Sequence, residues 1–134
     1  LDCGITNFDE VKLAKKMGFK TWIFDHHEVI KKTPPANLVI APKAKNNPPV
    51  FACLSNAGLA FYLSHLFLKE LGKDYPEEQI KEHLILAAIA TIADMMPVKE
   101  INRQLIDKGV EGTLESQRPG LRVFWERRLI KFRN

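Results

Sequence analysis

Cysteine is scarce in this sequence, and the motifs that depend on it are missing. Of 134 residues only Cys3 and Cys53 are cysteines, and they do not form the Cys-x-x-Cys spacing of a zinc knuckle or redox site. A disulfide framework is therefore not expected, and the predicted location is the reducing cytoplasm. Both cysteines are expected to be small buried hydrophobic residues.

Long apolar segments are also missing. The longest apolar stretch, residues 84–93, is well short of the roughly 18 residues that a membrane span needs. No basic segment precedes an apolar one at the start, so no signal peptide and no membrane partner are expected. The 46% hydrophobic and 27% charged residues are typical of one globular domain. The net charge of +4 permits a polyanionic partner without requiring one.

One short segment joins an apolar run to three polar side chains. Residues 21–24 are aromatic or β-branched, which predicts a buried strand, and Asp25, His26 and His27 follow at once. Sites in open α/β sheets lie at the carboxyl ends of strands. Oxygen and nitrogen donors without a thiolate suit Mn²⁺, Mg²⁺ or Zn²⁺ in a hydrolytic centre. A polar turn with solvated histidines accounts for this triplet equally well.

The residues before this strand predict a βαβ unit. Asp2 lies in what resembles the turn after a strand, and a helix capped by Asn7 or Asp9 should end at Gly18. Such crossovers join parallel strands, whose carboxyl ends share one edge. Asp2 and Asp25 are therefore expected side by side. The inward face of the helix is predicted to carry Val11, Leu13, Ala14 and Met17.

A helical half is expected after the sheet. A third strand is predicted at residues 37–40 and an irregular connection at residues 43–49. Ser55 is expected to cap the next helix. Basic residues between Arg122 and Arg133 are attributed to a solvated face rather than to a nucleic-acid surface. The fold class is α/β, a parallel sheet with βαβ units followed by helices over residues 56–71, 76–93, 99–110 and from about Leu121 onward.

The helix that ends at Asp94 is the most informative one. Residues 84–93 are apolar all round, which predicts burial on every side. A carboxylate at the C-terminal end would face the negative end of the helix dipole and lose water, penalties of about 1 kcal/mol or more each. A positive group such as a metal ion would offset them. The alternative is that Asp94 has reached solvent, or pairs with Lys99 or Arg103.

Acids and imidazoles thus come from two strand ends and one helix end. Such a cluster fits two-metal hydrolysis of a phosphate ester, in which two divalent ions clamp the phosphoryl group. It has too few ligands for a complete pair of octahedral ions. The other histidines, His65 and His83, are expected to be ordinary helix residues. The candidate residues are Asp2, Asp25, His26, His27 and Asp94.

Several motifs resemble those of the DHH phosphoesterase superfamily, and among its branches the RecJ-type single-stranded-DNA-specific exonucleases. The resemblance follows the chain in order over nearly its whole length. The spacing of Asp2, the Asp-His-His triplet and Asp94 makes it specific. The motifs are Asp2-Cys3-Gly4-Ile5, Asp25-His26-His27, Ser55-Asn56-Ala57-Gly58-Leu59-Ala60-Phe61, Ala90-Thr91-Ile92-Ala93-Asp94-Met95-Met96-Pro97, Glu100-Ile101-Asn102-Arg103 and Arg118-Pro119-Gly120-Leu121.

The resemblance implies a role for each site residue. Asp2 would bridge two ions, Mn²⁺ or Mg²⁺, and His26 would hold one of them together with Asp94. His27 would contact metal or the scissile phosphate, and Asp25 would support the site as a catalytic residue beside it. Arg103 is a candidate phosphate contact, although an ordinary surface arginine is an equally good interpretation.

The sequence departs from the family in two places. The Asp-x-Asp strand that precedes Asp2 in the family is missing, and so is the C-terminal DHH-associated domain. Residues 1–134 are therefore interpreted as a partial DHH domain. By itself it is expected to bind one metal ion weakly at best and to be inactive. The parent protein is expected to be an enzyme.

The expected function is exonucleolytic hydrolysis of single-stranded DNA in DNA repair and recombination. A single-stranded-DNA-binding protein is a further expected partner. A DHH-family oligoribonuclease or cyclic-dinucleotide phosphodiesterase is the alternative, with a pyrophosphatase third. A replication scaffold with the same fold is an alternative of another class, but a scaffold has no use for buried ligands that are costly when empty. The polarity of digestion and the choice of DNA or RNA stay open.

Overall fold

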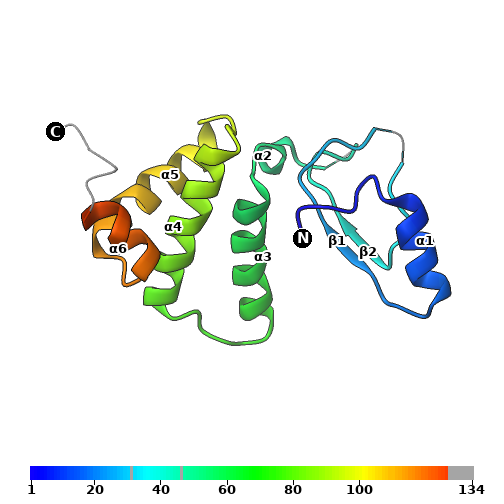
Figure 1. The fold of residues 1–134 in the computed structure, drawn as a ribbon, viewed down its shortest axis with the longest axis horizontal. Coiled ribbons are helices and arrows are strands. Elements are labelled where there is room, and N and C mark those ends of the chain that lie inside the picture. The colour runs from blue at the N-terminus through cyan, green and yellow to red at the C-terminus, as the bar shows by residue number, and fades with distance from the viewer. Residues whose placement is uncertain (31, 46, 127–134) are drawn as a thin grey trace.

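The sheet and the helical half lie at opposite ends of the molecule in the computed structural model, which describes residues 1–30, 32–45 and 47–126 (Figure 1). Strands β1 (Trp22–Phe24) and β2 (Leu38–Ile40) pair in parallel, with Phe24 opposite Ile40. Helix α1 (Phe8–Lys16) precedes β1. The predicted α/β class with a parallel sheet is confirmed.

The N-terminal segment runs beside β1. The backbone N–H of Asp2 donates to the carbonyl oxygen of Phe24 at 2.9 Å, so Asp2 and Asp25 lie at the same edge, as the βαβ pattern predicts. Ile23 is buried, and a Cβ added at Gly4 would touch its side chain at 3.2 Å. Successive strand residues face opposite sides, and Trp22 is exposed on the other side. The prediction of a fully buried strand is therefore wrong for Trp22.

Helix α1 buries a narrower stripe than its pattern predicts. Val11 is buried and Ala14 is half-buried, but Leu13 and Met17 are exposed. The prediction that Leu13 and Met17 point into the core is wrong, because no element of the described chain covers that side of the helix. Cys3 is exposed and Cys53 half-buried, so the expectation of two buried cysteines fails for Cys3.

The predicted helices form, with one short addition. The Oγ of Ser55 accepts a hydrogen bond from the Gly58 N–H at 3.1 Å, which confirms the predicted cap. Pro49 begins a short helix that the sequence did not predict. Residues 127–134, and with them Arg127, Arg128, Lys131 and Arg133, lie outside the described residues. The helices are α2 (Pro49–Ala52), α3 (Asn56–Glu70), α4 (Glu77–Ala93), α5 (Glu100–Gly112), the 3₁₀ turn η1 (Thr113–Glu115) and α6 (Pro119–Glu126).

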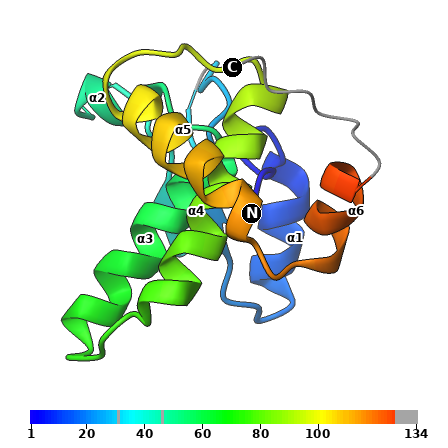
Figure 2. The ribbon, with the colours of Figure 1, turned by 90° about the vertical axis from the view of Figure 1, so that its left-hand side faces the viewer.

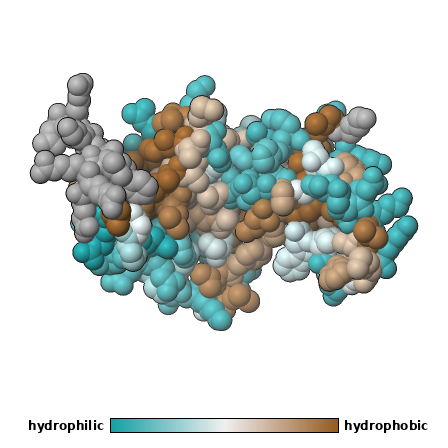
Figure 3. All heavy atoms as spheres, in the orientation of Figure 1, coloured by the Kyte–Doolittle hydropathy of each residue, from teal (hydrophilic) through white to brown (hydrophobic). Residues whose placement is uncertain are grey.

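The core of the helical half lies where α4 packs between α3 and α5 (Figure 2). Its buried residues include Ala87, Ala88 and Leu105. Complete burial of α4 is a wrong prediction, because part of its apolar surface stays open to solvent. The face of the molecule in Figure 3 mixes apolar with polar surface. Three apolar residues of α4 are 39–53% exposed. These residues are Leu86, Ile89 and Ile92.

An ion pair fastens the segment before α6 to α4. The Nε of Arg118 lies 2.9 Å from Oε2 of Glu82, and the same carboxylate accepts hydrogen bonds from the Ser116 hydroxyl and the Gln117 N–H. Burial raises the pKa of Glu82, but these hydrogen bonds and the guanidinium outweigh it and hold the pKa below its usual range. In the described part of the chain, no helix is long and apolar enough to cross a membrane.

We expect Gly109→Ala to loosen the α4–α5 contact. A Cβ at Gly109 would clash with the Ala88 Cβ and would lie 2.9 Å from the Leu84 carbonyl oxygen. The overpacking, about 1–3 kcal/mol, should exceed the gain in helix propensity, about 1 kcal/mol. Faster hydrogen–deuterium exchange of the α4 and α5 amides would report it. Gly120→Ala is the matched control because a Cβ there meets nothing within 4 Å; equal exchange in both variants would contradict the prediction.

Candidate metal centre

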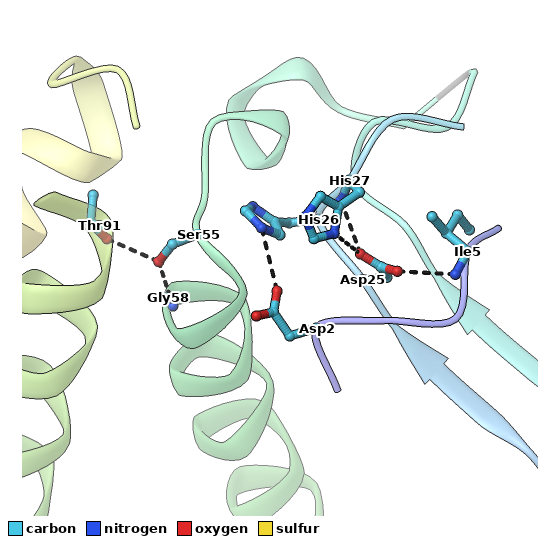
Figure 4. A network of polar contacts seen from close by, with 8 residues as sticks. All are labelled: Asp2, Ile5, Asp25, His26, His27, Ser55, Gly58 and Thr91. Atoms are coloured by element: carbon cyan, nitrogen blue, oxygen red, sulfur yellow. Dashed lines mark hydrogen bonds and ion pairs between the residues drawn. The ribbon is translucent and has the colours of Figure 1, made fainter. Parts of the chain in front are cut away.

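Three potential ligands converge where β1 ends. Asp2, His26 and His27 each offer one ligand atom, and these atoms all lie within 4.8 Å of one another. Asp2 comes from the N-terminal segment and the histidines from the turn after β1, as Figure 4 shows. His26 Nε2 lies 3.4 Å from Oδ1 of Asp2. His26 is buried, whereas Asp2 and His27 are exposed. The structure thus joins three of the predicted site residues.

The buried carboxylate of Asp25 holds His27 and the N-terminal segment in place by hydrogen bonds. This carboxylate is 1% exposed and accepts hydrogen bonds from the Ile5 N–H at 3.0 Å, the His27 N–H at 3.0 Å and the His27 ring Nδ1 at 2.7 Å. Burial raises the pKa of Asp25, but the hydrogen bonds outweigh burial and the net pKa is lowered. Asp25 is therefore a carboxylate at neutral pH and fixes the proton of His27 on Nδ1.

That hydrogen bond decides which His27 atom is free to act. With Nδ1 donating to Asp25, the lone pair of His27 is on Nε2, where it can bind a metal ion. A carboxylate that orients a ligating imidazole is a common arrangement in metal sites. The rings of His26 and His27 pack edge to face, with centroids 4.5 Å apart, so Asp25 also restricts the ring of His26.

Asn56 holds Asp2 in an unfavourable backbone conformation. Asp2 has φ +65°, in the left-handed region that costs a residue with a side chain about 1 kcal/mol. In the amide orientation that satisfies both neighbours, Asn56 Nδ2 donates to the Phe24 carbonyl oxygen at 3.0 Å and Oδ1 accepts from the Asp2 N–H at 2.9 Å. Asn56 was part of a family motif but was not predicted as a site residue; its place beside the helix cap Ser55 was the available signal.

Asp94 lies outside the three-residue cluster. It is the exposed C-cap of α4, so the predicted loss of water is wrong and the alternative that it reaches solvent is correct. One turn earlier on the same helix, Thr91 is hydrogen-bonded to Ser55. Thr91 Oγ1 donates to the Ala87 carbonyl oxygen at 2.7 Å, so the Ser55 hydroxyl, 3.1 Å away, donates to Thr91. The role of Asp94 stays a prediction.

Arg103 is not brought to the cluster either. Its side chain is exposed, and its Nε lies 3.9 Å from Oδ2 of Asp107 on the same helix. The adjacent Asn102 is buried and donates hydrogen bonds to the carbonyl oxygens of Cys53 and Pro97 at 2.6 and 3.0 Å. This part of the motif joins α5 to the chain before α3, and a phosphate contact by Arg103 stays a prediction.

The residues present fit a single divalent ion. Two ligands held about 2.1 Å from one ion lie roughly 3.0–3.4 Å apart, which matches the 3.4 Å between His26 Nε2 and Asp2 Oδ1. His26 Nδ1 is buried and has no hydrogen-bond partner among the described residues. Nε2 is therefore the His26 atom directed at the site. The mixed carboxylate and imidazole donors suit Mn²⁺ or Zn²⁺.

A family profile and individual relatives both match this chain to the same protein family. The sequence profile of the DHH family, N-terminal domain, matches residues 1–92. The single-stranded-DNA-specific exonuclease RecJ of Bacillus subtilis is 36% identical over 122 residues, which are 91% of this chain and 14% of that protein. RecJ of Thermus thermophilus is 36% identical over 126 residues, 94% of this chain and 18% of that protein.

A solved structure agrees with these relatives. A crystal structure of exonuclease RecJ bound to manganese superimposes with a TM-score of 0.79 and 34% sequence identity. The match covers 94% of this chain and 31% of that chain. This chain therefore spans less than a third of the proteins it matches.

We expect Asp25→Asn to weaken metal binding without removing a ligand. Asparagine keeps the volume but replaces one acceptor oxygen with an NH₂ group, so the side chain can no longer accept the hydrogen bonds of both Ile5 and His27. Loss of such a supporting group typically costs about 10–100-fold in metal affinity. Mn²⁺ titration of the native protein, followed by electron paramagnetic resonance, measures it. Asp9→Asn, at an exposed acid of α1, is the control, and equal affinity in both variants would contradict the assigned role.

Proposed function

The chain belongs to the DHH family, and we propose that it forms the metal-binding part of an exonuclease that hydrolyses the phosphodiester bonds of single-stranded DNA. The observation that carries the proposal is the convergence of Asp2, His26 and His27 within 4.8 Å. The relatives support the substrate because they are named single-stranded-DNA-specific exonucleases. The structure bound to manganese supports a divalent ion as the cofactor.

Each site residue would have a separate role in binding metal or substrate. Asp2 presents a carboxylate able to bridge two ions, and His26 Nε2 binds one of them. His27 Nε2, left free by the hydrogen bond from Nδ1 to Asp25, binds metal or a phosphate oxygen. Asp25 keeps that ring in place and holds its proton on Nδ1. Asp94, at the end of α4, would hold the same ion as His26; support comes from Thr91, one turn earlier on that helix, which is hydrogen-bonded to Ser55.

A bound divalent ion would supply a nucleophilic water at neutral pH and a counter-charge for the phosphate. The exposed positions of Asp2 and His27 leave the site open to a strand of nucleic acid. The buried positions of Asp25 and Asn56 keep its geometry fixed. Three close ligands suffice for one ion with waters, so we propose that residues 1–134 are part of a DHH domain whose Asp-x-Asp strand completes the second ion site.

The ligand set argues against a non-catalytic scaffold. A fold that served only as a platform would gain nothing from a left-handed aspartate facing a buried histidine, because both are unfavourable without an ion. The predictions of a role in DNA repair and recombination, of a cytoplasmic location and of a single-stranded-DNA-binding partner follow from the exonuclease proposal. Phosphate contact by Arg103 is part of the same proposal.

Mn²⁺-dependent digestion of 5′- and 3′-labelled single strands by the native protein tests the proposal. We expect digestion from one end, little digestion of the matching duplex, and none after chelation of the metal. His26→Ala and Asp94→Ala should each lower the rate about 100-fold or more, since even a supporting residue of a metal site contributes 10–100-fold.

His65→Ala is the matched control, because His65 is an exposed histidine on α3 outside the cluster. Its rate should stay within about twofold of the native rate, as is usual for surface substitutions. Wild-type rates in His26→Ala and Asp94→Ala would remove both residues from the mechanism. A native protein that leaves single strands intact but cleaves oligoribonucleotides or cyclic dinucleotides would replace the exonuclease with the other family activity.

A further inference from the structure

Lys43 lies beyond the same sheet edge as the Asp-His-His triplet. The parallel register sets Phe24 opposite Ile40, and the Asp25 N–H still donates to the Ile40 carbonyl oxygen at 3.0 Å. If the strand register is continued past Phe24 and Ile40, Lys43 lies opposite His27, because each is the third residue after its strand. Both loops leave the sheet at the end where Asp2 and His26 meet (Figures 1 and 4).

An ion pair joins the two loops. The Nζ of Lys43 lies 3.2 Å from Oε1 of Glu28, the residue after His27. The Lys43 side chain is only 25% exposed, whereas that of Glu28 is 74% exposed. The methylene stem of Lys43 is therefore packed and its ammonium group is held in place, while the Glu28 carboxylate can turn into solvent at little cost, because an ion pair with so exposed a partner contributes little to stability.

The turn that carries Lys43 is itself fixed. The Ala44 N–H donates to the Ala41 carbonyl oxygen at 2.9 Å, and the Asn47 side-chain amide donates to the same oxygen at 2.7 Å. Pro42 is buried. The ammonium group is thus presented from an ordered loop, which lowers the ordering cost of binding an anion.

The charges at this edge explain what the ammonium group is suited to bind. Asp2, Asp25 and Glu28 are acids, which repel a polyanion until a cation offsets them. A metal ion held by Asp2, His26 and His27 would offset the charge at the scissile phosphate, but the phosphates next to it would need another cation. A lysine binds phosphate as a point charge and needs no particular orientation of the oxygens.

We propose that Lys43 binds a backbone phosphate adjacent to the scissile one, and that this phosphate replaces Glu28 as its partner. The inference rests on the proposed function, since it assigns a subsite for the same single-stranded substrate. Lys43 is a substrate-binding residue and takes no part in the chemical step. Glu28 keeps the ammonium group in place when no strand is bound and competes with the strand for it.

The test compares a strand with a substrate that has no adjacent phosphate. In the native protein with Mn²⁺, Lys43→Gln should raise KM for single-stranded DNA about tenfold with little change in kcat, as loss of one charged phosphate contact would. The slope of log KM against log salt should fall by about 0.7, the value for one contact to a single strand. Hydrolysis of bis-p-nitrophenyl phosphate and Mn²⁺ affinity should not change.

Two further variants distinguish a charge contact from a structural role. Lys43→Arg keeps the charge and should stay within about threefold of the native KM. Glu28→Gln removes the competitor and should lower KM or leave it unchanged. An unaltered KM and salt slope in Lys43→Gln would overturn the inference, and so would a parallel loss of small-diester hydrolysis or Mn²⁺ affinity. A native protein that does not digest single strands would overturn the proposed function itself, and this inference with it.

Discussion

The buried carboxylate of Asp25 is the contact on which the site depends. It is a charge taken out of water, and it stays charged because the N–H groups of Ile5 and His27 and the ring of His27 all donate to it. These donors come from the segment before α1 and from the turn after β1. The same atoms that satisfy the carboxylate therefore bring the N-terminal segment to the strand end and set the tautomer of His27. Removal of the charge would free both segments together.

A second buried network joins the sheet edge to the helices. Asn56 holds the Asp2 backbone and the end of β1, while the preceding residue, Ser55, caps α3 and donates to Thr91 of α4. Each of these groups is buried and satisfied, which is the condition under which polar networks fix a single geometry. The network thereby links the N-terminal segment, the end of β1, α3 and Thr91 of α4, although these segments are far apart in sequence.

The sequence predicted this site well wherever a periodic rule applied. The parallel register put Asp2 beside Asp25, and Ser55 was recognised as a cap, because both depend on local geometry that repeats among proteins. The sequence left open whether Asp94 reaches solvent, and it did not predict the exposed apolar side of α4, because an apolar run does not show which neighbours pack against it. The hydrogen bonds of Asn56 and the left-handed backbone of Asp2 were also not predicted, since they depend on contacts between distant segments. The close approach of Gly109 on α5 to Ala88 on α4 was likewise not predicted, because it depends on how the two helices pack.

The distribution of burial has a consequence for how such a centre works. The supporting groups, Asp25, Asn56, Ser55 and Thr91, are buried and bonded, while Asp2, His27 and Asp94 are exposed. A ligand held by a rigid buried neighbour keeps its geometry without being covered itself. The centre can therefore stay open along the sheet edge and still be ordered before an ion or a phosphate binds. Ligands in an enclosed cavity would be equally well ordered, but such a cavity would admit only a small molecule.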